Sequence, residues 1–124
     1  MTHKVLIVDD DESMLHILGL ILDRAGYKTI TADNGIDALD MVKRYRPSLV
    51  ILDEMMPGIS GGEVCTRIKA DELLRHTPVV MHSAGTQIQS ESYLRRIGAD
   101  AALAKPCPPK KVVETVANIL AQTV

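Results

Sequence analysis

Residues 5–10 read Val-Leu-Ile-Val-Asp-Asp, an uninterrupted apolar run that ends directly in two carboxylates. A short run that is apolar throughout and rich in β-branched residues is typical of a strand covered on both faces, as in a parallel sheet between helix layers. Comparable runs stand at 49–52 (LVIL) and 79–81 (VVM). Residues 28–32 (KTITA) are more polar and indicate an edge strand, and residues 101–104 (AALA) indicate a fifth strand.

Segments with the helical spacing of apolar residues alternate with these runs. We expect Asp11 to cap the first helix, with Gly26 just past its end. The second helix is predicted to start near Asp33, with Asp33 as its cap, and to be ended by Pro47. The fourth expected helix, at 86–97, is only weakly amphipathic. In the other four, apolar residues mark one face of the helix; in chain order these are Met14, Ile17, Leu18, Ile21 and Ala25; Ile36, Leu39, Val42 and Tyr45; Val64, Cys65 and Ile68; and Val112, Val113, Val116, Ile119 and Leu120.

Strand and helix repeated five times predict an α/β fold with a doubly wound five-stranded parallel sheet and five helices on its two faces. The length of 124 residues predicts a single domain, in which hydrophobic residues are 46% and charged residues 24%. A net charge of −2 and only three aromatic residues argue against a nucleic-acid or membrane-surface partner. There is no apolar run of membrane-spanning length, and two cysteines without metal-like spacing favour a cytoplasmic protein.

Polar side chains follow four of the five predicted strands where each strand ends. These residues are Asp9 and Asp10, Asp53, Ser83 and Lys105. The carboxyl ends of parallel strands meet at one edge of the sheet, where ligands bind, so we expect these groups to converge. Carboxylates at close quarters repel and need a cation, and a set of oxygen ligands favours Mg²⁺. A metal, an ammonium and a hydroxyl beside an Asp suit phosphoryl transfer, in which the carboxylate can be the nucleophile.

With these residues in place, the sequence resembles the receiver domain of two-component response regulators over essentially its whole length. The resemblance is carried by residues 5–10 (VLIVDD), 53–61 (DEMMPGISG), 83–84 (SA) and 105–106 (KP). It implies the flavodoxin-like strand order 2-1-3-4-5. It also implies that residues 1–124 form a single receiver domain with no output domain in this chain.

The resemblance implies a role for each residue of the site. Asp53 would accept a phosphoryl group from a phosphohistidine on a sensor kinase or a histidine phosphotransfer protein. Asp10 would bind Mg²⁺ directly and Asp9 partly through water, with the backbone carbonyl of Met55 completing the protein ligands and Mn²⁺ able to replace Mg²⁺. Two further residues would bind phosphoryl oxygens, and a small neighbour would keep the site open: Ser83 and Lys105, and Ala84. The bond before Pro106 is expected to be cis.

Receivers of this family commonly carry an aromatic residue three positions before the Lys, and here that position is Ala102. Phosphorylation is expected to draw Ser83 and its loop inward and to repack the surface of the fourth helix, fifth strand and fifth helix, where an unknown downstream protein would bind. Tyr93 could replace the missing aromatic residue as a surface reporter, although a half-buried packing role is favoured over it.

Two alternatives remain open from the residues alone. Residues 9–13 (DDDES) nearly satisfy the D-x-D-x-T motif of haloacid-dehalogenase-like phosphohydrolases, in which Asp9 would be the nucleophile and Asp11 the acid/base. Against this alternative, the sequence has no later acidic pair and no cap insertion, and the motif at Asp53 goes unexplained. A degenerate receiver that only binds proteins is the second alternative, and the complete set of site residues argues against it.

Overall fold

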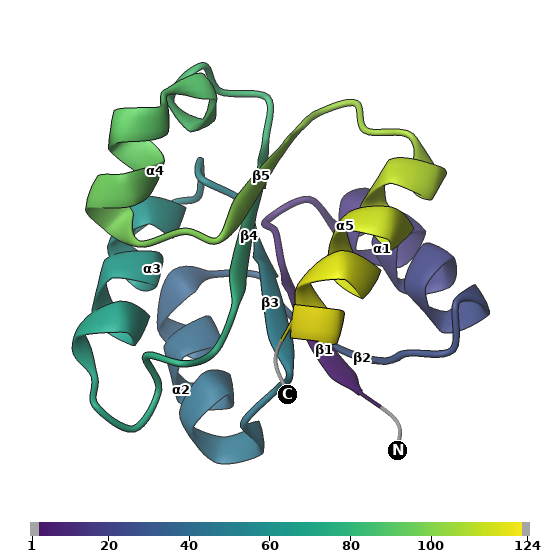
Figure 1. Ribbon diagram of the computed structural model, residues 1–124, viewed down its shortest axis with the longest axis horizontal. Helices are drawn as coiled ribbons and strands as arrows, with labels where there is room; N and C mark the ends of the chain where they lie inside the picture. The colour runs from purple at the N-terminus through teal and green to yellow at the C-terminus, as the bar shows by residue number, and fades with distance from the viewer. Residues whose placement is uncertain (1–2, 123–124) are drawn as a thin grey trace.

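The computed structural model describes residues 3–122, in which five parallel strands form one sheet with helices on both faces (Figure 1). The strands lie in the order β2-β1-β3-β4-β5, so the strand order that the resemblance implied is confirmed. Their bounds are β1 (Lys4–Val8), β2 (Lys28–Ala32), β3 (Leu49–Leu52), β4 (Val79–Ser83) and β5 (Ala101–Ala104). The helices are α1 (Glu12–Arg24), α2 (Gly35–Tyr45), α3 (Gly61–Ala70), the 3₁₀ turn η1 (Gln87–Gln89), α4 (Glu91–Ile97) and α5 (Pro109–Gln122).

Strands β1, β3, β4 and β5 contribute side chains to two hydrophobic cores, because successive side chains of a strand point to opposite faces of the sheet. In β1, Val5 and Ile7 pack toward α1 and α5, whereas Leu6 and Val8 pack toward α2, α3 and α4. All four are essentially inaccessible to solvent, which explains why the run is apolar without alternation. Figure 1 shows the two helix layers on either side of the sheet. Within residues 3–122, no helix combines the length and apolar character needed to cross a membrane.

The first residues of α1 and α2 are each preceded by a side chain that accepts a backbone hydrogen bond and so fixes the N-terminus of the helix. The prediction of Asp11 as the cap of α1 is confirmed, since its carboxylate accepts from the Ser13 amide. The prediction of Asp33 as the cap of α2 is wrong, because Asn34 is the residue in extended conformation and its Oδ1 accepts from the Asp37 amide at 2.9 Å. Both residue types are good caps, and adjacent candidates cannot be separated from the sequence alone.

The fourth helical segment is shorter than the sequence predicts. A single helix over 86–97 is wrong, because the chain forms η1 and then restarts as the seven-residue α4. Ser90 lies between them in extended conformation (φ −89°, ψ 117°), and its hydroxyl accepts from the Tyr93 amide at 3.2 Å. Because Ser90 is outside the helical region and caps α4, it divides the segment into two parts. The result is a short helix joined to β4 by a separate turn.

Candidate functional site

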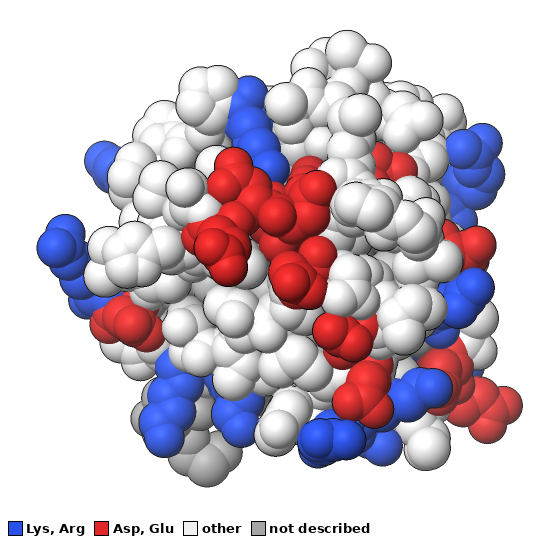
Figure 2. All heavy atoms as spheres, turned by 180° about the vertical axis from the view of Figure 1, so that it is seen from behind, with Lys and Arg blue, Asp and Glu red and all other residues white. Residues whose placement is uncertain are grey.

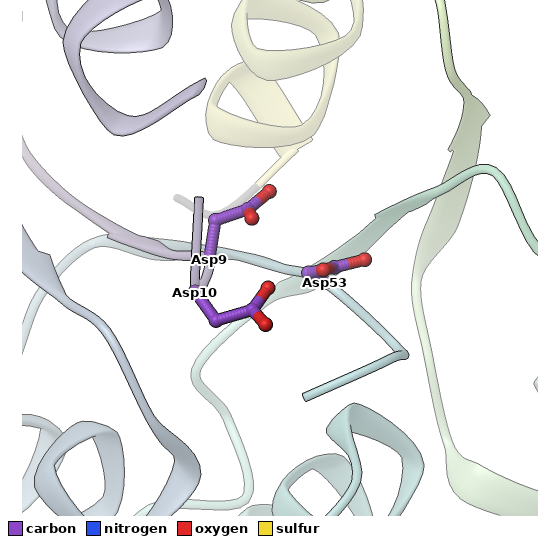
Figure 3. Close-up of side chains that lie close together, drawn as sticks. All are labelled: Asp9, Asp10 and Asp53. Atoms are coloured by element: carbon purple, nitrogen blue, oxygen red, sulfur yellow. The ribbon is translucent and has the colours of Figure 1, made fainter. Parts of the chain in front are cut away.

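Three carboxylates converge at the carboxyl edge of the sheet. Figure 3 shows Asp9 and Asp10 extending from the end of β1 toward Asp53, which follows β3. Each of these residues offers an oxygen, and the three oxygens lie within 4.8 Å of one another. Asp9 and Asp53 are buried, with exposed fractions of 1% and 5%, while Asp10 opens to solvent. A set of carboxylate oxygens with one open side fits a hard divalent cation that keeps some of its water.

Lys105, which follows β5, brings a positive charge between two of these carboxylates. Its Nζ lies 2.8 Å from Oδ2 of Asp9 and 3.6 Å from Oδ1 of Asp53. The Lys105 amide donates to the carbonyl oxygen of Ser83, which fixes the position of the residue at the strand end. The peptide bond between Lys105 and Pro106 is cis, as predicted. The predicted convergence of Asp9, Asp10, Asp53 and Lys105 is therefore confirmed by the geometry.

The pKa of Asp53 is raised above its ordinary value of 3.8. Burial is the main cause, because a desolvated carboxyl resists ionisation, and the nearby charge of Asp9 adds to it. Lys105 and hydrogen bonds from the Ser83 hydroxyl and the Met55 amide act in the opposite direction. The carboxylate is thus held by several partners in a site where its charge is costly, which is a setting typical of reactive groups.

Ser83, the last residue of β4, and Ala84 directly after it form one wall of the site. Ser83 is buried, and its hydroxyl oxygen also accepts from the Gly85 amide at 3.2 Å. Ala84 is exposed and offers only a methyl group beside it. The preceding residue, His82, is buried, and burial followed by the Lys105 charge lowers its pKa to about 4. His82 is therefore neutral near pH 7 and contributes no counter-charge to the carboxylates.

The sequence analysis missed Glu54, whose carboxylate is 5% exposed directly beside the site. Its Oε1 accepts a 2.5 Å hydrogen bond from the hydroxyl of Tyr93 in α4. Burial and this hydrogen bond raise the pKa of Tyr93. Tyr93 is half-buried and packs against the core, as the packing role requires, while its role in the switch stays a prediction. The sequence gives no sign of this pair, because the two residues are 39 positions apart and neither belongs to a periodic pattern.

Negative charge also extends beyond the three carboxylates. A neighbouring cleft of about 400 Å³, between α1 and α2, is lined by four acidic residues, Glu12, Asp33, Asp37 and Asp40. Figure 2 shows Asp and Glu side chains gathered on one face of the molecule. Clustered negative charge raises the local concentration of cations, which favours a divalent ion at this end of the protein.

The doubly wound fold places three carboxylates, a lysine and a serine at one edge of the sheet, a set of groups that suits a hard divalent cation and phosphoryl oxygens. The chain belongs to the response regulator receiver domain family, whose model matches residues 5–117. The polar-differentiation response regulator DivK of Brucella anthropi is 34% identical over 97% of this chain and 98% of its own length. A Chloroflexus aurantiacus protein of known structure is 36% identical with a TM-score of 0.92, covering 98% of this chain and 100% of its own. The chemotaxis response regulator CheY4 of Vibrio cholerae is 28% identical with a TM-score of 0.88, covering 96% of this chain and 99% of its own.

Receiver domains are the phosphoacceptor domains of two-component signalling and act as switches. They interact with histidine kinases or phosphotransfer proteins and with downstream targets, and they generally bind Mg²⁺ at an acidic pocket. The acidic pocket of this chain is the cluster of Asp9, Asp10 and Asp53. Membership of the family confirms the receiver interpretation and favours it over the phosphohydrolase alternative.

Proposed function

We propose that Asp53 is the phosphoacceptor of this receiver and that its modification switches the binding of a partner protein. An oxygen of the Asp53 carboxylate would attack the phosphorus of a phosphohistidine, and the phosphorus–nitrogen bond would break with its electron pair left on the imidazole. The observation that carries this assignment is the position of Asp53, buried and in contact with Lys105, within 4.8 Å of two further carboxylates. Asp9 shares these three features. What favours Asp53 over Asp9 is that the Asp53 carboxylate also receives hydrogen bonds from the Ser83 hydroxyl and the Met55 amide, and that its pKa is raised.

The remaining residues of the site receive roles from where they lie. Asp9, Asp10, Asp53 and the backbone carbonyl of Met55 would hold Mg²⁺, or Mn²⁺ in its place, which supplies positive charge to the phosphoryl oxygens. Lys105 already lies between Asp9 and Asp53, so its ammonium can pair with a phosphoryl oxygen after a small movement. The small side chain of Ala84 leaves access for the phosphodonor and for water, which would later hydrolyse the acyl phosphate. In this sense the chain assists its own phosphorylation and dephosphorylation, although it works as a signalling switch.

The switch would begin at Ser83. A phosphoryl group on Asp53 adds nearly two negative charges beside the Ser83 hydroxyl, which then has a stronger acceptor than it has now. Movement of Ser83 would shift the β4–α4 loop and so alter the surface formed by α4, β5 and α5, where we place the downstream partner. Ala102 of β5 is half-buried in this region and leaves it without a large switch side chain.

The test is the mass of the intact protein after treatment with acetyl phosphate, with and without Mg²⁺. We expect one added phosphoryl group that requires Mg²⁺ and is absent from Asp53→Asn. Asp33→Asn, which alters an acidic residue of the neighbouring cleft, is the matched control and should be labelled as the wild type is. No label on a folded protein that also fails to bind Mg²⁺ would leave a protein-binding module and reject the assignment.

A further inference from the structure

The hydrogen bond between Tyr93 and Glu54 is part of an interlocked set of three residues. Gly62, at the start of α3, is the third member, because a Cβ on it would overlap the Tyr93 hydroxyl oxygen and lie 3.1 Å from Oε1 of Glu54. The absence of a side chain at Gly62 therefore makes room for the bond. The other carboxylate oxygen of Glu54, Oε2, is buried and has no hydrogen-bond partner among the described residues. Among the described residues, Tyr93 thus supplies the side-chain hydrogen bond that the buried Glu54 carboxylate receives.

The Glu54 end of this bond is fixed to the sheet. The carbonyl oxygen of Glu54 accepts from the Gly61 amide at 2.9 Å, and the amide of the preceding Asp53 donates to the Val8 carbonyl oxygen at 2.9 Å. A Cβ on Gly61 would overlap the Asp53 carbonyl oxygen, so α3 packs directly against this backbone. Glu54 cannot follow a moving α4 without disturbing β1 and α3.

Tyr93, in contrast, lies in α4, which is joined to Ser83 at the end of β4 by residues 84–90. The Gly85 amide is bonded to the Ser83 hydroxyl oxygen at 3.2 Å, and residues 86–90 are held by hydrogen bonds within their own turn and by the buried side chain of Ile88. The Ser83 hydroxyl can donate to a phosphoryl oxygen on Asp53 while it still accepts from the Gly85 amide, so movement of Ser83 toward the phosphoryl group would carry Gly85 with it. A cleft of about 420 Å³ lies between Gln87 and the loop at Glu54, so the exposed side of the turn borders open space and water has a route to the Glu54 carboxylate.

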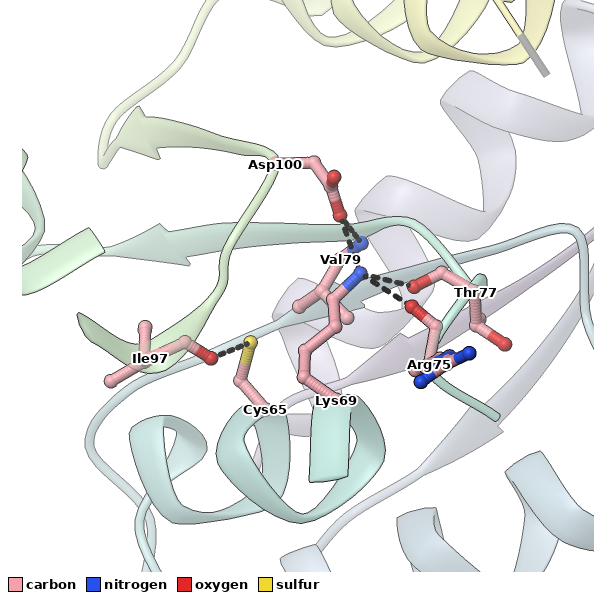
Figure 4. Close-up of polar contacts among 7 residues, drawn as sticks. All are labelled: Cys65, Lys69, Arg75, Thr77, Val79, Ile97 and Asp100. Carbon is pink, nitrogen blue, oxygen red and sulfur yellow. Dashed lines mark hydrogen bonds and ion pairs between the residues drawn. The ribbon is translucent and has the colours of Figure 1, made fainter. Parts of the chain in front are cut away.

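The C-terminal end of α4 is anchored independently (Figure 4). The Cys65 thiol donates to the carbonyl oxygen of Ile97 at 3.3 Å, and Ile97 itself is buried. Just beyond the helix, Asp100 accepts from the Val79 amide at 2.8 Å and from Lys69 Nζ at 2.9 Å. In the part of the chain that the structure describes, these two contacts of α4, at Tyr93 and at Ile97, are its side-chain hydrogen bonds to the rest of the protein. Release of the bond at Tyr93 would leave the contact at Ile97 as the remaining side-chain hydrogen bond of α4, with Leu94 still packed against the core.

We propose that the Tyr93–Glu54 hydrogen bond is a latch that holds α4 in its unphosphorylated position and breaks when Asp53 is phosphorylated. The inference rests on the proposed function, because the signal that releases the latch starts at Asp53 and Ser83. Tyr93 and Glu54 act through the position of α4 and have no role in the chemistry. The latch supplies a link between site and helix in a chain that has Ala102 where an aromatic residue is common in its family.

The first experiment observes the Tyr93 hydroxyl directly. The chain has three tyrosines and no tryptophan, so Tyr27→Phe with Tyr45→Phe leaves Tyr93 as the single tyrosine reporter. The tyrosine Fermi doublet in ultraviolet Raman spectra reports whether the hydroxyl donates strongly. We expect the signature of a strong donor in the free protein and its loss when beryllium trifluoride and Mg²⁺ are added. Fluorine NMR on the same sample shows whether beryllium trifluoride is bound.

The two measurements separate the failure of the latch from the failure of the proposed function. If beryllium trifluoride binds and the Raman signature of Tyr93 does not change, the latch is overturned and the phosphoacceptor assignment is left intact. If neither the tyrosine-substituted protein nor the wild type binds beryllium trifluoride, the proposed function itself is contradicted. If beryllium trifluoride binds and the Tyr93 signature changes, the latch and the phosphoacceptor assignment are both supported.

The second experiment removes the latch in two different ways. Tyr93→Phe deletes the hydroxyl, and Gly62→Ala displaces it while favouring the helix. If the latch opposes switching, either change should tighten binding of beryllium trifluoride by about tenfold, the equivalent of one lost hydrogen bond to a charged group. The double variant should bind no more tightly than Tyr93→Phe alone, because both changes release the same contact.

Tyr45→Phe is the matched control, since Tyr45 is exposed and lies on α2. It should bind beryllium trifluoride as the wild type does. Unchanged or weaker binding by Tyr93→Phe, with the protein folded by circular dichroism, overturns the latch. A gain for Gly62→Ala that simply adds to that of Tyr93→Phe would also contradict it, because the two residues would then act independently.

Discussion

Replacing Lys105 by Met is expected to destabilise the metal-free protein by about 3 kcal/mol. The ammonium lies 2.8 Å from Asp9 and 3.6 Å from Asp53, and its side chain is 18% exposed. Removing one partner from a buried ion pair typically costs about 3–5 kcal/mol, because the other charge is left buried without compensation. We take the lower end because Lys105 is partly solvated. The two carboxylates would then face each other without the cation between them.

The corresponding fall in melting temperature depends on the size of the chain. With an entropy of unfolding of roughly 2.1 cal/mol/K per residue, 124 residues give about 0.26 kcal/mol/K. A loss of about 3 kcal/mol therefore lowers the melting temperature by about 12 °C. Thermal unfolding followed by circular dichroism in EDTA measures this shift.

Addition of Mg²⁺ should recover much of the loss, because a divalent cation replaces the missing positive charge beside Asp9 and Asp53. The Lys105→Met variant should thus gain more melting temperature from Mg²⁺ than the wild type gains. Lys110→Met is the matched control, since Lys110 pairs with Glu114 on the surface of α5 at 4.0 Å, and its loss should change stability by less than about 0.5 kcal/mol. A metal-free Lys105→Met protein as stable as the wild type would refute the reasoning that Lys105 offsets the buried carboxylates.

Three further predictions concern the acidic site and its packing. Asp10→Asn should weaken Mg²⁺ binding in calorimetric titration by about tenfold or more, and an unchanged affinity would remove Asp10 from the ligands. Because burial raises the pKa of Asp53 in the folded state, the fold binds its proton more tightly than the unfolded chain does, so this residue's contribution to stability is lost as pH rises. Without Mg²⁺, denaturant unfolding of Asp53→Asn should therefore show a gain over the wild type that grows as the pH rises above about 4, and a gain independent of pH would argue against the raised pKa. Gly61→Ala should cost about 2 kcal/mol or more in the same assay, because its Cβ would overlap the Asp53 carbonyl oxygen, whereas Gly19→Ala, with no contact closer than 3.9 Å, should stabilise α1 by roughly 0.5–1 kcal/mol.

The strands could be read from the sequence because burial on both faces leaves a direct compositional trace. The predicted runs at 28–32, 49–52 and 101–104 match β2, β3 and β5, while β1 and β4 extend the predicted runs by one and two residues. The extension of β4 through His82 and Ser83 is informative, since both are polar and buried. Polar residues at the end of a buried strand are absent from an apolar pattern, and one of these two, Ser83, reaches the site.

The site was predictable where it depends on strand ends and unpredictable where it depends on packing between distant elements. Topology alone brings Asp9, Asp53 and Lys105 together, because parallel strands end at one edge. The contact between Glu54 and Tyr93 depends on the position of α4, which depends on the break at Ser90 and on the space at Gly62. No local pattern encodes that combination, so the structure was needed to find it.

Which carboxylate carries the phosphoryl group is the most direct test of this account. The acyl phosphate formed with acetyl phosphate and Mg²⁺ can be trapped with borohydride, which marks the modified residue for peptide mapping by mass spectrometry. We predict that the mark lies on Asp53 alone and that Asp53→Asn carries none. A mark on Asp9, with phosphate esters hydrolysed in repeated turnovers, would contradict the account and establish phosphohydrolase chemistry in its place.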